Sequence, residues 1–585
     1  MKIQTTSTVL LTVILAPLLL TFQAAADTST IPDPRFGVVE AYQAPDAATA
    51  LGAGWTRVTF RWNEIQPNGP GEWNVLPISD EMLSGELSRG RQVVGLLVTT
   101  PGWATDLAVG PGVPRSLHLP TDDPKNLWAG FVRTIVNRYA GRIDHWIVWN
   151  EPDIPGTHHM SWGGSVEDFV RLLQVAYTVA RDTNPDAVIH LPAVTHWWNE
   201  DWFGDFLAAL VDAPNAATND YYFDVATLHV YFQPETVYDI TVHYRDMMLG
   251  YGMVKPIWIG ETNAAPSQDT AWPVSGAQFN VSLEQQAAYI VQAFSLGIAA
   301  GAERIAVYKM ADTEADRQAN PEPFGLVRQD GSRRPAFRAY QAATTYLSGY
   351  RTARWERRDT IATVTVDRGD RTTTVLWSRT PEAQTAMVPA RATRGLLVDA
   401  RGTARHVYPE RGYYYVDLPG AHCPQGCMIG GEPYMLVETA PVAADTAPTP
   451  QPPVPTTTHM PASDASVTPT ETLPWTMTPS PSPTATSTTT PRVRETRTAT
   501  VGPTPCATPS CTPVHAATPT ATTLPRPTPL PTPSPSSGTR ATPTPSPPLR
   551  SLVAHTANPD RPVVLIGVLA MILGGAALTA QEERP

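Results

Sequence analysis

The chain has 585 residues, too many for one ordinary domain, and its 61 prolines crowd toward the C-terminal end. With 42 basic and 54 acidic residues it carries a net charge of −12, which argues against nucleic acid or an anionic membrane surface as the main partner. The first 420 residues contain no cysteine, so they must fold on a hydrophobic core alone. The spacing of Cys423 with Cys427, and of Cys506 with Cys511, suits local disulfides in an exported protein.

Residues 1–26 have the pattern of a secretory signal peptide. Lys2 supplies a positive start, Val9–Phe22 supplies an apolar run, and Ala24–Ala26 offers a cleavage site of small residues. The alternative is a retained N-terminal anchor, which the short apolar run and the alanine triplet disfavour. We therefore expect the protein to be exported.

Residues 27–350 alternate between strand-like and helix-like stretches, as a β/α protein with a parallel sheet does. Apolar residues recur at helical spacing in 127–136 and 169–180, and Ser282 with Gln285 resembles a capping box for a helix that ends at Gly301. Eight strands predict a (β/α)₈ TIM barrel, whereas a doubly wound sheet lacks the glycine-rich loop that would follow its first strand. The expected strands are Phe36–Tyr42, Thr56–Arg61, Gln92–Thr99, His145–Trp149, Ala187–Val194, Val225–Phe232, Pro256–Gly260 and Arg304–Met310.

Residues 351–439 change to short alternating runs separated by turn signals, which predicts a small β-sandwich. Residues 440–562 are mostly Pro, Thr, Ser and Ala. Such a segment cannot bury a core, and it predicts an extended, disordered stalk.

Residues 563–580 are an uncharged apolar run, followed by the short tail 581–585. The run has the minimum length of a transmembrane helix, about 18 residues, and no further domain remains in which it could be buried. We expect a C-terminal membrane anchor, and a cleaved lipid-anchor signal is the weaker alternative.

Two glutamates at strand ends are the strongest indication of function. Glu151 lies in Trp149–Pro152, where proline stops a buried strand, and Glu261 follows the strand Pro256–Gly260. The two strands are the fourth and seventh, whose C-terminal ends face each other across a barrel mouth. Two facing carboxyl groups can hydrolyse a glycosidic bond, with retention when they are about 5 to 5.5 Å apart and with inversion at about 6.5 to 9.5 Å.

These motifs resemble those of clan A glycoside hydrolases, most closely families 39 and 5. The resemblance covers the barrel and, more loosely, the sandwich. It is specific for the clan and only weakly so for a family. The segments that carry it are 61–67, 100–104, Trp149–Pro152, His229–Tyr231, Trp258–Glu261, Phe324–Leu326 and Arg334–Phe337.

The resemblance implies that Glu151 is the general acid/base and Glu261 the nucleophile. It implies that Asn150 hydrogen-bonds the sugar 2-hydroxyl, and that Arg61 lies beside the nucleophile and favours its ionised form. Tyr231 would bond the same carboxylate.

The resemblance further implies that His229 lines the sugar site. Trp103 belongs to a set of loop tryptophans that suggest a carbohydrate cleft, together with Trp62, Trp162, Trp197, Trp198, Trp202 and Trp272. The clan usually has a tryptophan at the end of strand eight, where this chain has Tyr308-Lys309. Either Tyr308 substitutes for it or Lys309 meets an anionic group of the substrate, such as a uronic acid, unless Lys309 is an ion-pair partner.

The expectation is a retaining O-glycosyl hydrolase that acts on a carbohydrate, needs no cofactor or metal, and is held outside the cell membrane by its C-terminal helix. A catalytically silent glycan-binding protein and a transglycosylase on the same scaffold are the alternatives. A zinc hydrolase is disfavoured because His158, His159 and His196 lack the helical spacing of such sites.

Overall fold

The structure is a computed structural model, and it describes residues 32–74, 78–154, 161–277, 279–319, 322–423 and 428–439. The expected signal peptide, stalk, transmembrane helix and tail lie outside these residues. None of the helices within them has both the length and the apolar character needed to cross a membrane.

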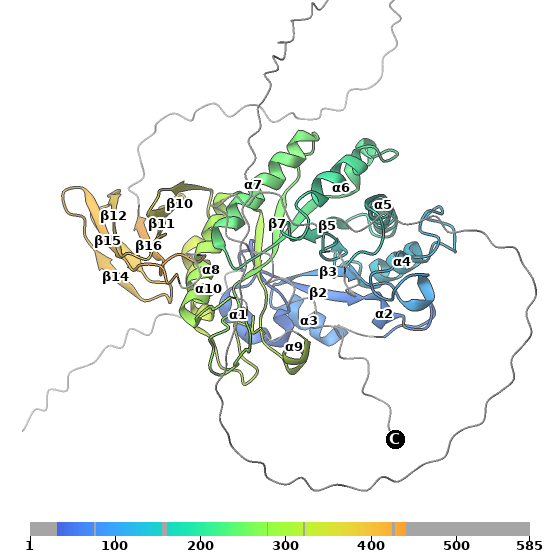
Figure 1. The fold of residues 1–585 in the computed structure, drawn as a ribbon, viewed down its shortest axis with the longest axis horizontal. Helices are drawn as coiled ribbons and strands as arrows, with labels where there is room; N and C mark the ends of the chain where they lie inside the picture. Colours follow the sequence, from blue (N-terminus) through green and yellow to red (C-terminus); the bar gives the residue numbers. More distant parts are fainter. Residues whose placement is uncertain are drawn as a thin grey trace, which may run out of the picture. The chain divides into compact units, whose positions relative to one another are not determined.

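Eight parallel strands close into a barrel in the order β1 to β8, which confirms the predicted TIM barrel and excludes an open doubly wound sheet (Figure 1). Every predicted strand is present, with shifted ends. The strands are β1 Phe36–Val38, β2 Trp55–Arg61, β3 Gln92–Val98, β4 His145–Val148, β5 Val188–Val194, β6 Val225–Tyr231, β7 Ile257–Asn263 and β8 Arg304–Val307.

Strand β7 runs three residues farther than predicted, so Glu261 lies within the strand and not after it. The register between β6 and β7 shifts after Leu228, and beyond the shift His229 pairs with Glu261. This irregularity re-aims side chains near the top of the barrel, as bulges beside active sites commonly do.

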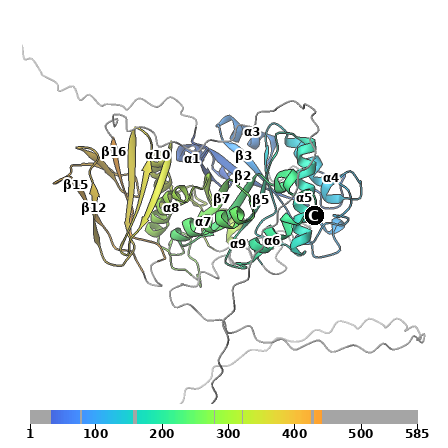
Figure 2. The ribbon, with the colours of Figure 1, turned by 90° about the horizontal axis from the view of Figure 1, so that it is seen from above.

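The helices alternate with the strands and cover the barrel (Figures 1 and 2). Helix α8 begins with the predicted capping box of Ser282 and Gln285 and is followed by Gly301 at φ 76°. The helices are α1 Pro45–Leu51, α2 Trp62–Ile65, α3 Asp80–Ser88, α4 Leu127–Tyr139, α5 Val166–Thr183, α6 Trp202–Val211, α7 Pro234–Gly250, α8 Leu283–Ala299, α9 Glu314–Ala319 and α10 Pro335–Leu347.

Three buried tryptophans, Trp55, Trp146 and Trp258, belong to the barrel core. The rings of Trp55 and Trp258 are 5.3 Å apart. Two of the rings lie against glycines, where any side chain would collide with them. A Cβ atom at Gly37 would lie 2.3 Å from the Trp55 ring, and one at Gly95 would lie 2.4 Å from the Trp146 ring. Each such ring removes a large apolar area from water, which stabilises the closed barrel.

After the barrel, the chain forms two antiparallel sheets: a six-stranded sheet in the order β14-β13-β16-β11-β10-β9 and a two-stranded sheet of β12 and β15. An apolar cluster that includes Leu376, Leu397 and Tyr414 packs between them, as the predicted sandwich requires. The strands are β9 Thr352–Arg357, β10 Ile361–Asp367, β11 Arg371–Ser378, β12 Gln384–Pro389, β13 Gly395–Val398, β14 Ala404–Val407, β15 Tyr413–Leu418 and β16 Tyr434–Thr439.

The other face of the larger sheet packs on the barrel, where β9 and β10 contact α8. Arg379 donates to both carboxylate oxygens of Glu235 on α7 at 2.6 and 3.0 Å. On α8, the Gln292 side chain donates to the Gly431 carbonyl at 2.9 Å. Buried apolar and polar contacts therefore join the two domains. Nearby, Cys423 is disulfide-bonded.

Candidate active site

Glu151 follows β4 at the C-terminal mouth of the barrel, on a backbone held in an uncommon conformation. Trp149 has φ 75° and Glu151 has φ 44°, values that cost a residue with a side chain about 1 to 3 kcal/mol. Neighbouring strands hold this turn: the Trp149 amide donates to the Leu97 carbonyl at 2.8 Å, and the Glu151 amide donates to the Ala193 carbonyl at 2.9 Å. The barrel thereby fixes where the Glu151 carboxyl group points.

Glu261, on β7, is 4% exposed and is surrounded by hydrogen-bond donors. Arg57 Nη2 donates to Glu261 Oε1, and the Tyr231 hydroxyl donates to Glu261 Oε2. Burial by itself would raise the pKa of Glu261, but the charge of Arg57 and the hydrogen bonds from Arg57 and the Tyr231 hydroxyl lower it below its usual value. Glu261 is therefore kept as an anion at neutral pH.

His229, on β6, lies between the two glutamates and is 2% exposed. Its Nδ1 is 2.6 Å from Glu151 Oε1 and 3.6 Å from Glu261 Oε2. Its Nε2 is 3.2 Å from Arg57 Nη1. Because a guanidinium only donates, Nε2 must accept. The imidazole is therefore neutral, and Nδ1 donates to Glu151.

The carboxylates of Glu151 and Glu261 offer oxygens within 4.8 Å of each other. This separation is close to the spacing of about 5 to 5.5 Å in retaining glycosidases and is shorter than the spacing of about 6.5 to 9.5 Å of an inverting pair. One carboxyl group that is held as an anion faces a second that contacts a neutral imidazole. This arrangement suits a nucleophile opposite an acid/base.

The same cluster of Glu151, His229 and Glu261 could offer three ligand atoms to a metal ion. However, the Arg57 guanidinium already contacts Glu261 and His229, and it would repel a cation placed there. The sequence positions His158 and His159 lie outside the described residues. The His196 ring packs against Trp197, with centroids 5.2 Å apart.

The expectation that Arg61 lies beside the nucleophile is wrong. Arg57 holds that position, while Arg61, at the end of β2, is 3.8 Å from Glu64 and 31% exposed. Residues four apart in a strand share a face but lie about 13 Å apart along it. The hydrogen bond to Glu261 shows that Arg57 reaches the carboxylates, whereas Arg61 lies four residues farther along β2 and contacts Glu64. An arginine inside the predicted strand Thr56–Arg61 is the feature of the sequence that could have identified Arg57.

The structure brings the other expected residues to the same mouth. Asn150 is buried beside Glu151, and its backbone pairs with Ala193. The Tyr308 ring is 6.3 Å from the ring of Tyr231. Trp103 is half-buried at the end of β3, with its Nε1 donating to the Gln66 carbonyl at 2.6 Å. Trp103 therefore stabilises a loop there and presents only part of its ring.

Most of the other loop tryptophans are core residues and not a sugar platform. Trp62 is fully buried and stacks on Phe131 at 4.9 Å, and Trp162, Trp202 and Trp272 are at most 7% exposed. Two half-buried rings remain besides Trp103: Trp197 and Trp198.

One residue beside the site had no signal in the sequence analysis. Asp153 is 3% exposed, and its Oδ2 accepts from the amides of Thr195 and His196 and from the Thr195 hydroxyl. Burial raises the pKa of Asp153 to about 7, against the hydrogen bonds from Thr195, and the nearby charge of Glu151 adds to the rise. Asp153 connects the loop after β4 to the loop after β5.

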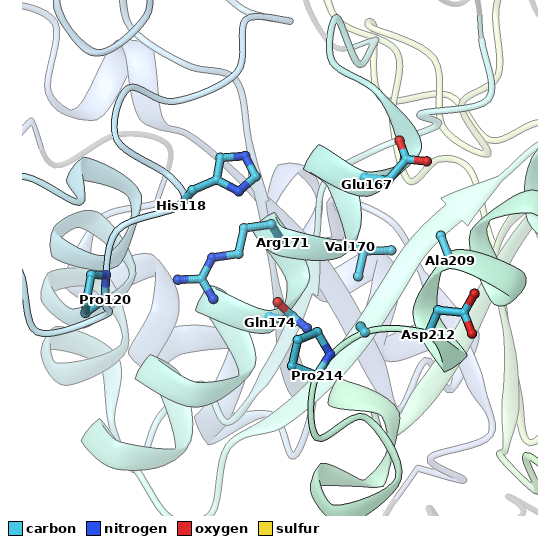
Figure 3. Close-up of a pocket in the computed structure, with 10 residues that line it drawn as sticks. His118, Pro120, Glu167, Val170, Arg171, Gln174, Ala209, Asp212 and Pro214 are labelled. Carbon is cyan, nitrogen blue, oxygen red and sulfur yellow. The ribbon is translucent and has the colours of Figure 1, made fainter.

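A hollow of about 680 Å³ lies elsewhere, outside the barrel between α5, α6 and the loop at His118 (Figure 3). Two of its polar groups are engaged: His118 contacts Asp168 at 2.9 Å, and Arg171 donates to the Leu117 and Leu119 carbonyls. None of the expected site residues lines it. The hollow is a gap between helices and not the site of the two glutamates.

Comparison with known proteins supports the expectation from the motifs. A family model described as the glycosyl hydrolase catalytic core matches residues 122–340, a span that contains Glu151 and Glu261. A search of curated protein sequences found no match.

Among solved structures, two family 39 enzymes are similar to this chain. A family 39 glycoside hydrolase from the gut symbiont Bacteroides cellulosilyticus WH2 is 16% identical, with a TM-score of 0.52 over 70% of this chain and 82% of that chain. A family 39 β-xylosidase from Caulobacter crescentus is 16% identical, with a TM-score of 0.46 over 72% of this chain and 98% of that one. The family model supports the predicted resemblance to glycoside hydrolases: this chain is an O-glycosyl hydrolase, and its residues 122–340 match a glycosyl hydrolase catalytic core.

Proposed function

We propose that the protein is a retaining glycoside hydrolase that cleaves O-glycosidic bonds in oligosaccharides or polysaccharides by double displacement. Glu261 is the nucleophile and Glu151 the general acid/base. The observation that carries the proposal is the pair of carboxylate oxygens within 4.8 Å, one carboxylate held as an anion by Arg57 and Tyr231.

In the first step a Glu261 oxygen bonds to the anomeric carbon while the glycosidic C–O bond breaks. The Glu151 proton passes to the leaving oxygen. In the second step Glu151 takes a proton from water, the water oxygen bonds to the anomeric carbon, and Glu261 is released as a carboxylate. Asn150, beside Glu151, is the residue we assign to the sugar 2-hydroxyl.

Arg57 and Tyr231 have a second consequence for this reaction. They stabilise the Glu261 carboxylate both before attack and as the leaving group of the second step. Glu151 contacts the neutral His229 and not a guanidinium, and it is the group we assign to give a proton in the first step and take one in the second.

The test compares Glu151→Gln and Glu261→Ala on aryl glycosides with good and poor leaving groups. Glu151→Gln should nearly abolish turnover of poor leaving groups, while activated substrates still form a glycosyl-enzyme that can be detected by mass spectrometry. Glu261→Ala should form no such adduct. Activity of Glu261→Ala equal to that of the parent would refute the assignment.

The stereochemistry of the first product distinguishes the remaining candidates. Retention in an NMR time course supports double displacement, and inversion refutes it. Transfer of the glycosyl group to sugar acceptors in preference to water would identify a transglycosylase, which uses the same residues. Glycan binding without turnover would identify a silent relative, a reading that the intact set of Glu151, Glu261, Asn150, Arg57 and Tyr231 disfavours.

We further propose that the enzyme works outside the cell, tethered by its C-terminal end. The support is the sequence: a secretory signal in residues 1–26, a Pro- and Thr-rich stalk in 440–562 and an apolar run in 563–580. Release of full-length protein from membranes by salt alone would contradict this anchor, whereas detergent extraction would support it.

A further inference from the structure

A buried ammonium group at the end of β8 is enclosed by two carboxylates. Lys309 Nζ lies 2.7 Å from Glu40 Oε2 and 2.8 Å from Asp316 Oδ1. The Lys309 side chain is 5% exposed, while those of Glu40 and Asp316 are 22% and 24% exposed. The sequence left open whether Lys309 binds an anionic group of the substrate or forms an ion pair within the protein. The structure shows Lys309 in ion pairs with Glu40 and Asp316. Two carboxylates against one ammonium leave this cluster with a formal charge of −1.

The cluster lies on the same barrel face as the catalytic glutamates. Val38 of β1 pairs with Val307 of β8, so Glu40 and Lys309 each come two residues beyond that pair. The Met310 amide donates to the Val39 carbonyl at 2.9 Å, which holds the two segments side by side. The cluster therefore lies at the mouth, on the side of β8, β1 and β2.

Tyr308 connects this cluster to the nucleophile. Its ring is 6.3 Å from that of Tyr231, whose hydroxyl donates to Glu261. Burial raises the pKa of Tyr308; Lys309 opposes the rise, and the charges of Glu40 and Glu261 both add to it. The Tyr308 phenol is therefore close enough to Glu40 and to Glu261 for the charge of each to affect it.

The carboxylates of Glu40 and Asp316 differ in how many of their oxygens already accept a hydrogen bond. Asp316 is saturated, because its Oδ2 accepts from the Thr313 amide and hydroxyl at 2.6 and 2.7 Å while its Oδ1 faces Lys309. Glu40 uses only Oε2, for Lys309 and for the Gln43 amide group at 2.7 Å. Among the residues that the structure describes, Glu40 Oε1 has no partner. It is an oriented, partly exposed acceptor at the mouth.

We propose, on the basis of the function proposed above, that Glu40, held in place by Lys309, accepts a hydrogen bond from a hydroxyl of the sugar, and that the cluster restricts the site to neutral sugars. A sugar hydroxyl can donate to a carboxylate and satisfy Oε1. A uronic acid would bring a carboxylate against a cluster that is already negative, with Lys309 neutralised. Among the described residues, two further cations lie near this cluster: Arg57 is held by Glu261, whereas Arg61 is held only by a 3.8 Å contact with Glu64.

The experiment uses the full chain with matched pairs of 4-nitrophenyl glycosides: a neutral pyranoside and the uronide of the same sugar and anomer. The parent should favour the neutral member in kcat/KM by about 100-fold or more, because an unmatched buried charge is strongly rejected. A preference for the uronide would overturn the inference. It would indicate that Arg61 binds the carboxylate of the uronide. Complete loss of turnover in Glu261→Ala on whichever substrate reacts shows that the proposed function itself stands.

Glu40→Gln keeps the shape and removes the charge. It should lower kcat/KM for the neutral substrate by about 10-fold, because a neutral amide oxygen is a weaker acceptor than a carboxylate, and should narrow the discrimination against the uronide. Glu64→Gln, at a half-exposed carboxylate on α2, is the matched control and should leave both values within about twofold. Equal discrimination in Glu40→Gln and the parent would refute the role of Glu40.

Monodeoxy substrates separate contact from indirect effects and guard against a misfolded variant. One deoxy position should cost the parent more than it costs Glu40→Gln, because the neutral amide oxygen of the variant accepts from the same hydroxyl more weakly. Additive losses at every position would overturn the proposed contact. If no glycoside of either class reacts and Glu261 forms no adduct, the proposed function fails, and this inference fails with it.

Discussion

The surroundings of the two glutamates differ more than their common place at the barrel mouth would suggest. Glu261 receives a guanidinium, a phenol and the edge of an imidazole, and its pKa is lowered although it is buried. The Glu151 side chain contacts the neutral His229, and the buried Asp153 lies two residues away. The comparison shows how one barrel gives two identical side chains different surroundings: a guanidinium and a phenol hold Glu261 as an anion, whereas Glu151 contacts an uncharged imidazole.

Removal of the cation should break this comparison most strongly. In Arg57→Met the pKa of Glu261 should rise, because burial is then opposed only by weaker donors. We expect kcat/KM to fall about 10²- to 10³-fold, as when an electrostatic stabiliser is lost. The acid limb of the pH–rate profile should move to higher pH, since the nucleophile must be ionised.

Arg61→Met is the matched control on the same strand. Its partner Glu64 is 41% exposed, so the change should lower kcat/KM by less than about threefold and leave the acid limb in place. A larger loss in Arg61→Met than in Arg57→Met would show that Arg61 serves the nucleophile.

Tyr231→Phe should produce an intermediate loss. It removes the hydroxyl that donates to Glu261 Oε2 and keeps the ring. We expect kcat/KM to fall about 10-fold, with a smaller move of the acid limb than in Arg57→Met, because a neutral donor contributes less than a cation. Pre-steady-state measurements should locate the loss in formation and breakdown of the glycosyl-enzyme. An unchanged pH profile would exclude Tyr231 from control of the Glu261 charge.

Asp153→Asn tests the surroundings of Glu151, and its main expected effect is on the stability of the protein. The native pKa of Asp153 is raised to about 7, above the unfolded value of about 3.9, so the native state binds the extra proton between them. The free energy of unfolding should therefore fall as pH rises from about 4 to 7. Above that range Asp153 is ionised in both states, and the free energy of unfolding should fall no further from this cause. Asn keeps the acceptor for Thr195 and cannot ionise.

Urea denaturation at pH 5 and pH 8 measures this effect. The free energy of unfolding of Asp153→Asn relative to the parent should increase by about 2 kcal/mol between the two pH values. A constant difference would show that Asp153 is ionised throughout, and the burial argument would then be wrong.

Much of the fold could be read from local patterns. Apolar runs of five to eight residues marked all eight barrel strands, and the capping box of α8 was visible because Ser282 and Gln285 are three residues apart. The strand ends were less certain: β7 continues to Asn263 because pairing with β6 extends past a shift in register, which no local pattern records. Trp62 and Trp202 were expected in a carbohydrate cleft but are buried in the core. No local pattern records this either, because the burial of a loop tryptophan depends on what packs over it.

The sequence by itself determined the barrel, the two glutamates and their opposition across the mouth, because strand order and strand-end position follow from the linear pattern. The tertiary structure decided which arginine serves Glu261, that His229 lies between the two carboxylates, and that Lys309 is already neutralised. The physical reason is depth: side chains four residues apart on one strand are alike in the pattern, but only the closed barrel brings one of them within hydrogen-bond distance of a buried anion.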